Sequence, residues 1–286
     1  MTEKDLQHDA PDMSQLKKYA RDLALIYRSE KEKGQKLQAA EQEIEKYADD
    51  LNKTIAELKA VDQELREAYL DTIHRLVLAA EYKDEDTGDH IVRMGRYCAF
   101  LAERLGMSTE DTQNILYAAP MHDVGKIGIP DSILLKSGKL TEEEFELMKE
   151  HTTIGAKILA NSSAKILQIA QEIAISHHEK WSGKGYPNGL SGDNIPLVGR
   201  IASLADVFDA LTSRRPYKEP YPVETACGII ADGRGDHFDP ALVTLFLKNI
   251  DEMVAIKTDV DRAQNMSLSD ATGKGTEWRI NRGAPE

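Results

Sequence analysis

The chain has 286 residues, of which 41% are hydrophobic, and this is sufficient for one folded domain with an additional segment. Its formal net charge of −13 excludes duplex nucleic acid as a partner, because duplex binding depends on an extended basic surface. Two widely separated cysteines, Cys98 and Cys227, together with the lack of an apolar leader or a long uncharged run, predict a cytoplasmic protein without a membrane span.

Residues 1–13 are expected to be flexible, and residues 14–69 carry a heptad repeat. Leucine or isoleucine recurs every seventh residue, with Glu30 in the one exceptional position: Leu16, Leu23, Leu37, Ile44, Leu51, Leu58 and Leu65. A single helix packed on its own domain is the alternative, but no globular surface is long enough to cover about fifty helical residues. We therefore predict a long N-terminal helix that forms a parallel coiled-coil dimer.

Residues 70–257 carry apolar residues at three- and four-residue spacings, which predicts a helical domain and an all-α fold. The expected helical segments are 91–106, 110–123, 141–160, 163–178, 198–213 and 239–250. Beyond these, residues 258–286 are polar and have no apolar period, so we expect a mostly disordered C-terminal tail.

Two segments rich in glycine and proline interrupt the helical pattern, at residues 125–139 and 181–196. Each directly follows a histidine-containing segment, so we expect non-helical loops that contact a substrate. Thr141 with Glu144 three residues later, and Asp239 before Pro240, are typical of helix N-termini after these loops.

Histidine and aspartate residues form a pattern that predicts a divalent-metal site. Its members are Asp86, His90, His122, Asp123, His151, His177, His178 and Asp206. Each histidine alone is compatible with an ordinary core or surface residue. Together, however, these polar side chains follow or interrupt apolar helical sequence, where buried polar groups need partners, and a metal ion provides them. Imidazole with carboxylate suits Fe, Mn, Zn or Ni.

Three stretches of this sequence resemble the HD-GYP family, a subgroup of the HD phosphohydrolases. They are MHDVGKIGIPD at 121–131, HHEKWSGKGYPNGL at 177–190 and ADVFDALTSRRPYK at 205–218. The resemblance covers residues from about 70 to 250 and implies that the domain at 70–257 is an all-α HD-domain helical bundle. It also implies hydrolysis of cyclic di-GMP, through pGpG to GMP.

The resemblance assigns roles to individual residues. It implies that the eight histidines and aspartates above ligate two or three divalent ions, most often Fe and alternatively Mn. Asp86 stands where members with a third metal usually carry glutamate, so the third ion depends on it. Lys126 would face the scissile phosphate, Gly185, Tyr186 and Pro187 form the name-giving motif, and Arg215 with Lys218 would bind the substrate's phosphates. Ser182 replaces a common aspartate, which would loosen the loop.

Two metal ions would generate hydroxide and hold the phosphoryl oxygens, with Asp123 as the bridging ligand and Lys126 neutralising the developing charge. Two other functions stay open: hydrolysis of another nucleotide such as cyclic GMP-AMP, and a silent receptor that binds ligand through Arg215 and Lys218. No sensor domain is recognisable in this sequence. We expect a homodimer that receives its signal from an upstream sensor or a diguanylate cyclase partner, whether or not the chain is part of a longer protein.

Overall fold

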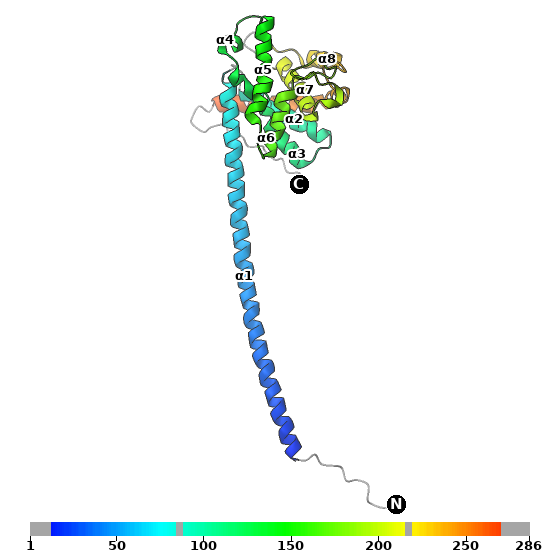
Figure 1. The fold of residues 1–286 in the computed structure, drawn as a ribbon. Helices are drawn as coiled ribbons and strands as arrows, with labels where there is room; N and C mark the ends of the chain where they lie inside the picture. Colours follow the sequence, from blue (N-terminus) through cyan, green and yellow to red (C-terminus); the bar gives the residue numbers. More distant parts are fainter. Residues whose placement is uncertain (1–12, 84–87, 215–218, 270–286) are drawn as a thin grey trace, which may run out of the picture. The chain divides into compact units, whose positions relative to one another are not determined.

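The computed structural model describes residues 13–83, 88–214 and 219–269, and these residues are almost entirely helical (Figure 1). The α-helices are α1 (Met13–Glu81), α2 (Gly88–Arg104), α3 (Thr109–Ala118), α4 (Asp131–Leu134), α5 (Glu142–Leu159), α6 (Lys165–Ser176), α7 (Leu197–Thr212), α8 (Val223–Asp232), α9 (Pro240–Lys248) and α10 (Ile250–Ser269). Short 3-10 helices are η1 (Ala119–Met121), η2 (Val124–Gly128) and η3 (Gly192–Asn194). The described parts contain no β-strand, which confirms the all-α prediction.

Helix α1 is continuous over 69 residues, which confirms the predicted long N-terminal helix (Figure 1). The chain divides into two compact units between Tyr69 and Leu70, so α1 contributes to both. In the first unit the heptad leucines and isoleucines are exposed, from 46% for Leu16 to 70% for Leu23. The pairing of this apolar seam with a second chain stays a prediction.

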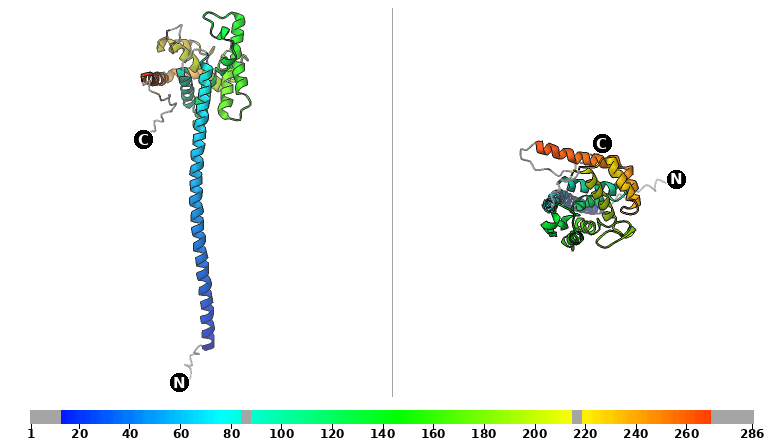
Figure 2. Two further views of the ribbon diagram at one scale, coloured as in Figure 1. Left: turned by 90° about the vertical axis from the view of Figure 1, so that its left-hand side faces the viewer. Right: turned by 90° about the horizontal axis from the view of Figure 1, so that it is seen from above.

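The second unit is a bundle built around α2, α3, α6 and α7, which pack against one another (Figure 2). Its core contains large side chains that are fully buried, among them Met94, Tyr97, Ile173, Phe208 and Phe246. These residues recur on one face of each helix, so burying them fixes how the helices lie side by side.

Helix α5 packs on α6 and on η2, and this contact depends on Gly125. A Cβ atom added at Gly125 would lie 1.9 Å from the carbonyl oxygen of His151. Only glycine therefore permits the two segments to approach this closely. This close approach places Asp123, the residue just before η2, next to His151 on α5.

The predicted helix 110–123 ends earlier than expected. Helix α3 stops at Ala118 and a 3-10 turn follows, with Pro120 in its first turn, because proline lacks the N–H that an α-helix interior requires. The segment 125–139 is also more ordered than the expected loop, since it includes η2 and α4. Together these short turns reverse the chain around His122 and Asp123.

The predicted disorder of the tail is wrong for residues 258–269, which belong to α10. Val260 is buried, and Asp261 accepts a hydrogen bond from Arg93 of α2 at 3.1 Å. Few apolar residues mark residues 258–269 in the sequence, and an ion pair contributes to the docking of this part of the helix. Residues 1–12, 84–87, 215–218 and 270–286 lie outside the described residues, and the expected flexible N-terminus falls among them. No described helix is long and apolar enough to cross a membrane.

Candidate metal centre

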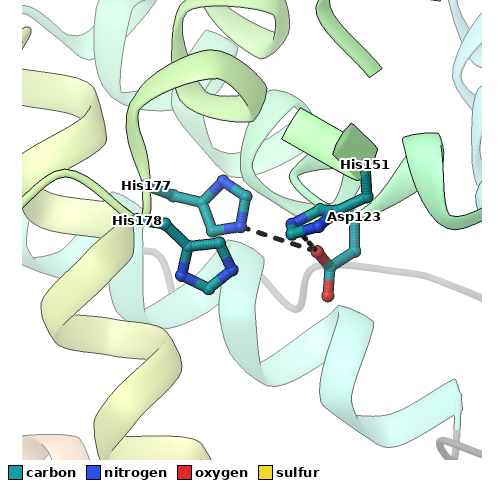
Figure 3. Close-up of side chains that lie close together, drawn as sticks. All are labelled: Asp123, His151, His177 and His178. Atoms are coloured by element: carbon teal, nitrogen blue, oxygen red, sulfur yellow. Dashed lines mark ion pairs between the residues drawn. The ribbon is translucent and has the colours of Figure 1, made fainter. Parts of the chain in front are cut away.

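Seven of the eight predicted ligands lie in two neighbouring groups of side chains. The four-residue group consists of Asp123, His151, His177 and His178 (Figure 3), and the three-residue group consists of His90, His122 and Asp206. Within each group the ligating atoms lie within 4.8 Å of one another. The eighth predicted ligand, Asp86, lies outside the described residues.

The four-residue group has the spacing of ligands that share one ion. The Nε2 atoms of His151 and His177 lie 3.3 Å and 3.5 Å from the Oδ1 atom of Asp123 (Figure 3). Two ligands that are each about 2.1 Å from one metal, at tetrahedral or octahedral angles, are separated by about 3.0 to 3.4 Å. These three atoms are buried, and within the described parts of the chain none has a hydrogen-bond partner. The group therefore fits a metal ion, which would satisfy all three.

The imidazole rings are held so that Nε2 faces the centre. The Nδ1 atoms of His122 and His151 donate to the carbonyl oxygens of Ala119 and Met148, at 3.1 Å and 2.7 Å, and Nδ1 of His177 donates to that of Ile173 at 3.1 Å. A carbonyl oxygen only accepts, so each Nδ1 carries a proton, and in the neutral ring Nε2 presents a lone pair. This arrangement is typical of metal-ligating histidines.

Asp123 lies between the two groups. Its Oδ1 atom faces His151 and His177, whereas its Oδ2 atom lies 3.3 Å from Nε2 of His122. The ring of His122 lies 5.3 Å from that of His90, and Nε2 of His90 is 4.0 Å from Oδ1 of Asp206. One carboxylate thus offers an oxygen to each group, which is the arrangement of a ligand that bridges two metal ions.

His90 is positioned by an ion-pair network that the sequence analysis missed. Its Nδ1 atom donates to Asp209 at 2.8 Å, Asp209 also accepts from Arg93 at 3.0 Å, and Arg93 reaches Asp261 of α10. Burial would raise the pKa of Asp209, but hydrogen bonds from His90 and Arg93 keep it below its ordinary value. A second aspartate three residues after Asp206, in an otherwise apolar helix, was the signal available in the sequence.

The protonation states of the ligands suit cation binding. Burial would raise the pKa of Asp123, but Lys126 and His122 beside it hold that pKa well below its usual range. Burial lowers the pKa of His151 to about 4 and also lowers that of His178, so both rings are neutral ligands at pH 7. Burial alone would lower the pKa of His122, but the charge of Asp123 outweighs it and raises the pKa to about 9. A bound cation would displace the proton of His122.

The loop with Gly185, Tyr186 and Pro187 closes one side of the four-residue group. The ring of Tyr186 lies 4.8 Å from that of His178, and the Tyr186–Pro187 peptide bond is cis. A Cβ atom at Gly185 would lie 2.3 Å from the backbone nitrogen of Lys180, so the backbone packs closely here. The loop therefore places Tyr186 at the metal centre.

The carboxylate of Glu179 holds this loop, accepting from the backbone N–H groups of Asn188 and Leu190 at 2.7 Å and 3.0 Å. The backbone N–H of Ser182 donates to the carbonyl oxygen of Asp236 at 2.8 Å. These contacts hold the loop through its backbone, and the expected loosening by Ser182 stays a prediction.

Among the predicted substrate-binding residues, Lys126 is described in full. Its Nζ atom lies 2.7 Å from Oδ2 of Asp123, and its side chain is 16% exposed. Arg215 and Lys218 lie outside the described residues.

The HD domain family is matched by residues 78–242 of this chain. A cyclic di-GMP phosphodiesterase of Thermotoga maritima is 43% identical over 81% of this chain and 65% of its own length. In Vibrio cholerae, a cyclic di-GMP phosphodiesterase is 47% identical over 72% of this chain and 44% of its own length, and 3'3'-cGAMP-specific phosphodiesterase 2 is 44% identical over 69% and 38%. The chain thus spans between 38% and 65% of the length of these relatives.

The crystal structure of the cyclic GMP-AMP-specific phosphodiesterase V-cGAP3 of V. cholerae has a similar fold. Its TM-score is 0.50 at 20% identity, over 67% of this chain and 52% of that one.

Proposed function

Because the chain belongs to the HD domain family, in its HD-GYP branch, we propose that it is a metal-dependent phosphodiesterase that hydrolyses cyclic di-GMP through pGpG to GMP. The observation that carries this proposal is the position of Asp123. One of its oxygens faces Nε2 of His151 and the other faces Nε2 of His122, and both nitrogen atoms are buried without a hydrogen-bond partner among the described residues. Relatives of 43% and 47% identity that bear this activity in their names support the choice of substrate.

When bound, two divalent ions would activate a water molecule and hold the phosphoryl oxygens. Asp123 would keep them together as the bridging ligand, with the imidazoles of His151, His177 and His178 on one side and those of His90 and His122, with Asp206, on the other. A phosphodiester must then enter on the side of the centre that the ligands leave open.

We assign Lys126 to the charge that develops on the phosphate. Its ammonium group pairs with Asp123 in the metal-free chain, and a metal ion on the carboxylate would take over that role. The ammonium group would then donate to a non-bridging phosphate oxygen, a contribution of about 3 kcal/mol to the transition state by analogy with other preorganised donors.

The name-giving motif would line the substrate side of the centre, where Tyr186 lies beside His178. We propose that its ring packs against the substrate, that Gly185 and Pro187 fix its position, and that Arg215 and Lys218 bind the outer phosphates.

Iron is the metal that we propose, with manganese as the alternative. The three-residue group offers two imidazoles and one carboxylate, the donor set of non-haem Fe(II) sites that keep open positions. A third ion, if it binds, would depend on Asp86.

A second substrate, cyclic GMP-AMP, is favoured by one observation. A relative of 44% identity carries specificity for 3'3'-cGAMP in its name, and the others carry cyclic di-GMP at nearly the same identity. Both substrates present a phosphodiester to the metal centre, so the discrimination between them would come from contacts to the bases.

We propose that the first unit pairs with a second copy of the chain through its heptad seam. Six of the seven heptad leucines and isoleucines are at least 60% exposed, which is unfavourable for a lone helix in water. A signal from an upstream sensor or partner would reach the enzyme through α1.

The test is to purify the full chain without oxygen, reconstitute it with Fe(II) or Mn(II), and follow cyclic di-GMP, pGpG and GMP by chromatography. Cyclic GMP-AMP is assayed in parallel, and chelated protein is the control. Two or three ions per chain with formation of pGpG and GMP support the proposal. Bound metal without turnover of either nucleotide would contradict it and favour a receptor.

A further inference from the structure

Lys83, which follows closely after the end of α1, is a cationic side chain that none of the roles above includes. Its side chain is 27% exposed, and its ammonium group contacts the segment that follows Lys126. The Nζ atom donates to the carbonyl oxygens of Ile127 at 3.1 Å and Ile129 at 2.7 Å, and it lies 3.2 Å from Oδ1 of Asp131. An ammonium group has three N–H donors, so these three oxygens can use all of them.

Two of the three oxygens are backbone carbonyls at the end of η2, the turn that carries Lys126. A 3-10 helix of five residues is short, and its last carbonyl groups have no partner within the helix. A lysine beside such carbonyls satisfies them and interacts favourably with the helix end. The backbone N–H of Ile129 in turn donates to the carbonyl oxygen of Lys126 at 3.0 Å. Lys83 thus binds the residue next to Lys126 in the chain and the residue hydrogen-bonded to its carbonyl group.

Lys83 is itself attached to a part of α1 that is buried in the bundle. Its backbone N–H donates to the carbonyl oxygen of Ala80 at 3.3 Å, and both Ala80 and Val77 are buried. The turn η2 also packs on α5 at Gly125. Two separate elements therefore hold this turn, and the contact from the end of α1 depends on one charged side chain.

The position of η2 determines where the ammonium group of Lys126 lies. That group is 2.7 Å from Oδ2 of Asp123, and the side chain is only 16% exposed, so it has little freedom to compensate for a shift of its backbone. A small misplacement of a group that acts on the reacting phosphate has a large effect on the rate.

From these contacts we infer that Lys83 is a positioning residue, which holds η2 so that the ammonium group of Lys126 faces the phosphate. The inference rests on the proposed role of Lys126 in hydrolysis. It adds a residue that lies outside the three motif-bearing stretches of the sequence, and it attaches the end of α1 to the turn at the metal centre.

A role of Lys83 in general stability would have a different signature. If Lys83 only stabilised the bundle, its replacement would lower the activity by the same factor whichever residue stands at position 126. A positioning residue acts through Lys126, so its replacement should have little effect once the ammonium group of Lys126 is removed.

The experiment is a double-mutant cycle with Lys83→Met and Lys126→Ala in the full chain, reconstituted with Fe(II) or Mn(II). Methionine is nearly as long as lysine but has no N–H donor. We expect Lys83→Met to lower kcat for cyclic di-GMP about tenfold with unchanged metal content, and to change kcat less than about twofold when Lys126 is already alanine. Lys59→Met, at an exposed position of α1, removes the same charge and should behave as wild type.

A measurement without substrate keeps this inference separate from the proposed hydrolysis. Hydrogen–deuterium exchange of the metal-free chains reports the stability of the turn, since the amide of Ile129 is hydrogen-bonded within it. We expect exchange in residues 126–131 to be at least about threefold faster in Lys83→Met than in wild type, with exchange in α6 unchanged.

An unchanged kcat or an unchanged exchange rate in Lys83→Met would overturn the inference. Equal effects of Lys83→Met with lysine and with alanine at position 126 would also overturn it, as would the loss of a metal ion, because the effect would then not act through Lys126. If Lys83→Met does not fold, Lys83→Gln takes its place in the cycle, with an N–H donor on a shorter side chain, and the same outcomes decide. The absence of turnover in wild type would contradict the proposed hydrolysis, whereas the exchange rates would still test whether Lys83 holds the turn.

Discussion

The two groups of metal ligands are held in place by different means. In the four-residue group, His151 and His177 donate to backbone carbonyls of their own helical turns, at Met148 and Ile173. In the three-residue group, His90 depends on the side chain of Asp209, which is held by Arg93 and so linked to α10. Local backbone contacts form as soon as the helix forms. The side-chain network requires three helices to be docked correctly.

This difference means that the two ions should not respond alike to perturbation. The four-residue group depends on secondary structure and the close contact at Gly125, whereas His90 of the three-residue group depends on long-range ion pairs. We expect the ion of the four-residue group to be bound more tightly and to be retained when the bundle is loosened. Four variants test this expectation. The first, Asp123→Asn, should abolish the difference in affinity between the two ions.

Replacing Asp123 with Asn should have the largest effect, because Asp123 contributes an oxygen to each group. Metal content should fall to less than one ion per chain, and the turnover number by about 10³-fold or more. Mass spectrometry and single-turnover assays measure both, with the exposed Asp232→Asn as the control. Two ions retained at full affinity in Asp123→Asn would exclude a bridging role.

Lys126→Ala should separate chemistry from metal binding. The ammonium group contacts Asp123 in the metal-free chain and is assigned to the phosphate in the complex. The expected result is a fall of roughly 10² in kcat, about 3 kcal/mol, with both ions still bound. Lys139→Ala, at an exposed site beyond α4, is the matched control. If kcat is unchanged at saturating substrate, Lys126 does not act on the phosphate.

Asp209→Asn should affect one group only. It weakens the support of His90 while leaving the four-residue group intact, so we expect one ion to be retained and the other to bind about tenfold to a hundredfold more weakly. A metal titration that resolves the two sites measures this, and circular dichroism confirms that the variant is folded. Equal weakening of both ions would mean that the two groups are not supported independently.

Thr141→Ala should have the smallest effect. The Thr141 side chain and Glu144 form a capping box at the start of α5, the helix that carries His151. Its loss should cost about 1 kcal/mol of unfolding free energy and lower the melting temperature by about 2 to 4 °C. Because Nδ1 of His151 is held within its own helix, metal affinity should not change. A parallel loss of affinity would show that the end of α5 is coupled to the centre.

The sequence was informative where a side chain has a chemical motif around it and less so where its role arises from packing. The helical segments follow from apolar spacing, and the caps at Thr141 and Asp239 are those expected. Asp209 was missed because it lies in apolar helical sequence, and only the docked bundle shows that it is buried and hydrogen-bonded to His90.

The C-terminal part of α10 was also missed in the sequence analysis. Residues 258–269 of α10 include few apolar side chains, and this polar sequence suggested disorder. An ion pair with Arg93 and the burial of Met253 and Val260 dock it on the bundle. The apolar period detects helices that dock through hydrophobic side chains and does not detect one that docks partly through charge.

Asp261 lies 19 residues beyond the end of the segment that matches the HD domain family at residue 242. It is nevertheless connected to the metal centre through Arg93, Asp209 and His90 in turn. The match to the HD domain family therefore ends before the last residue of the hydrogen-bond network that supports His90. A fragment that ends with this match would keep every ligand of the three-residue group but lose the outermost support of His90.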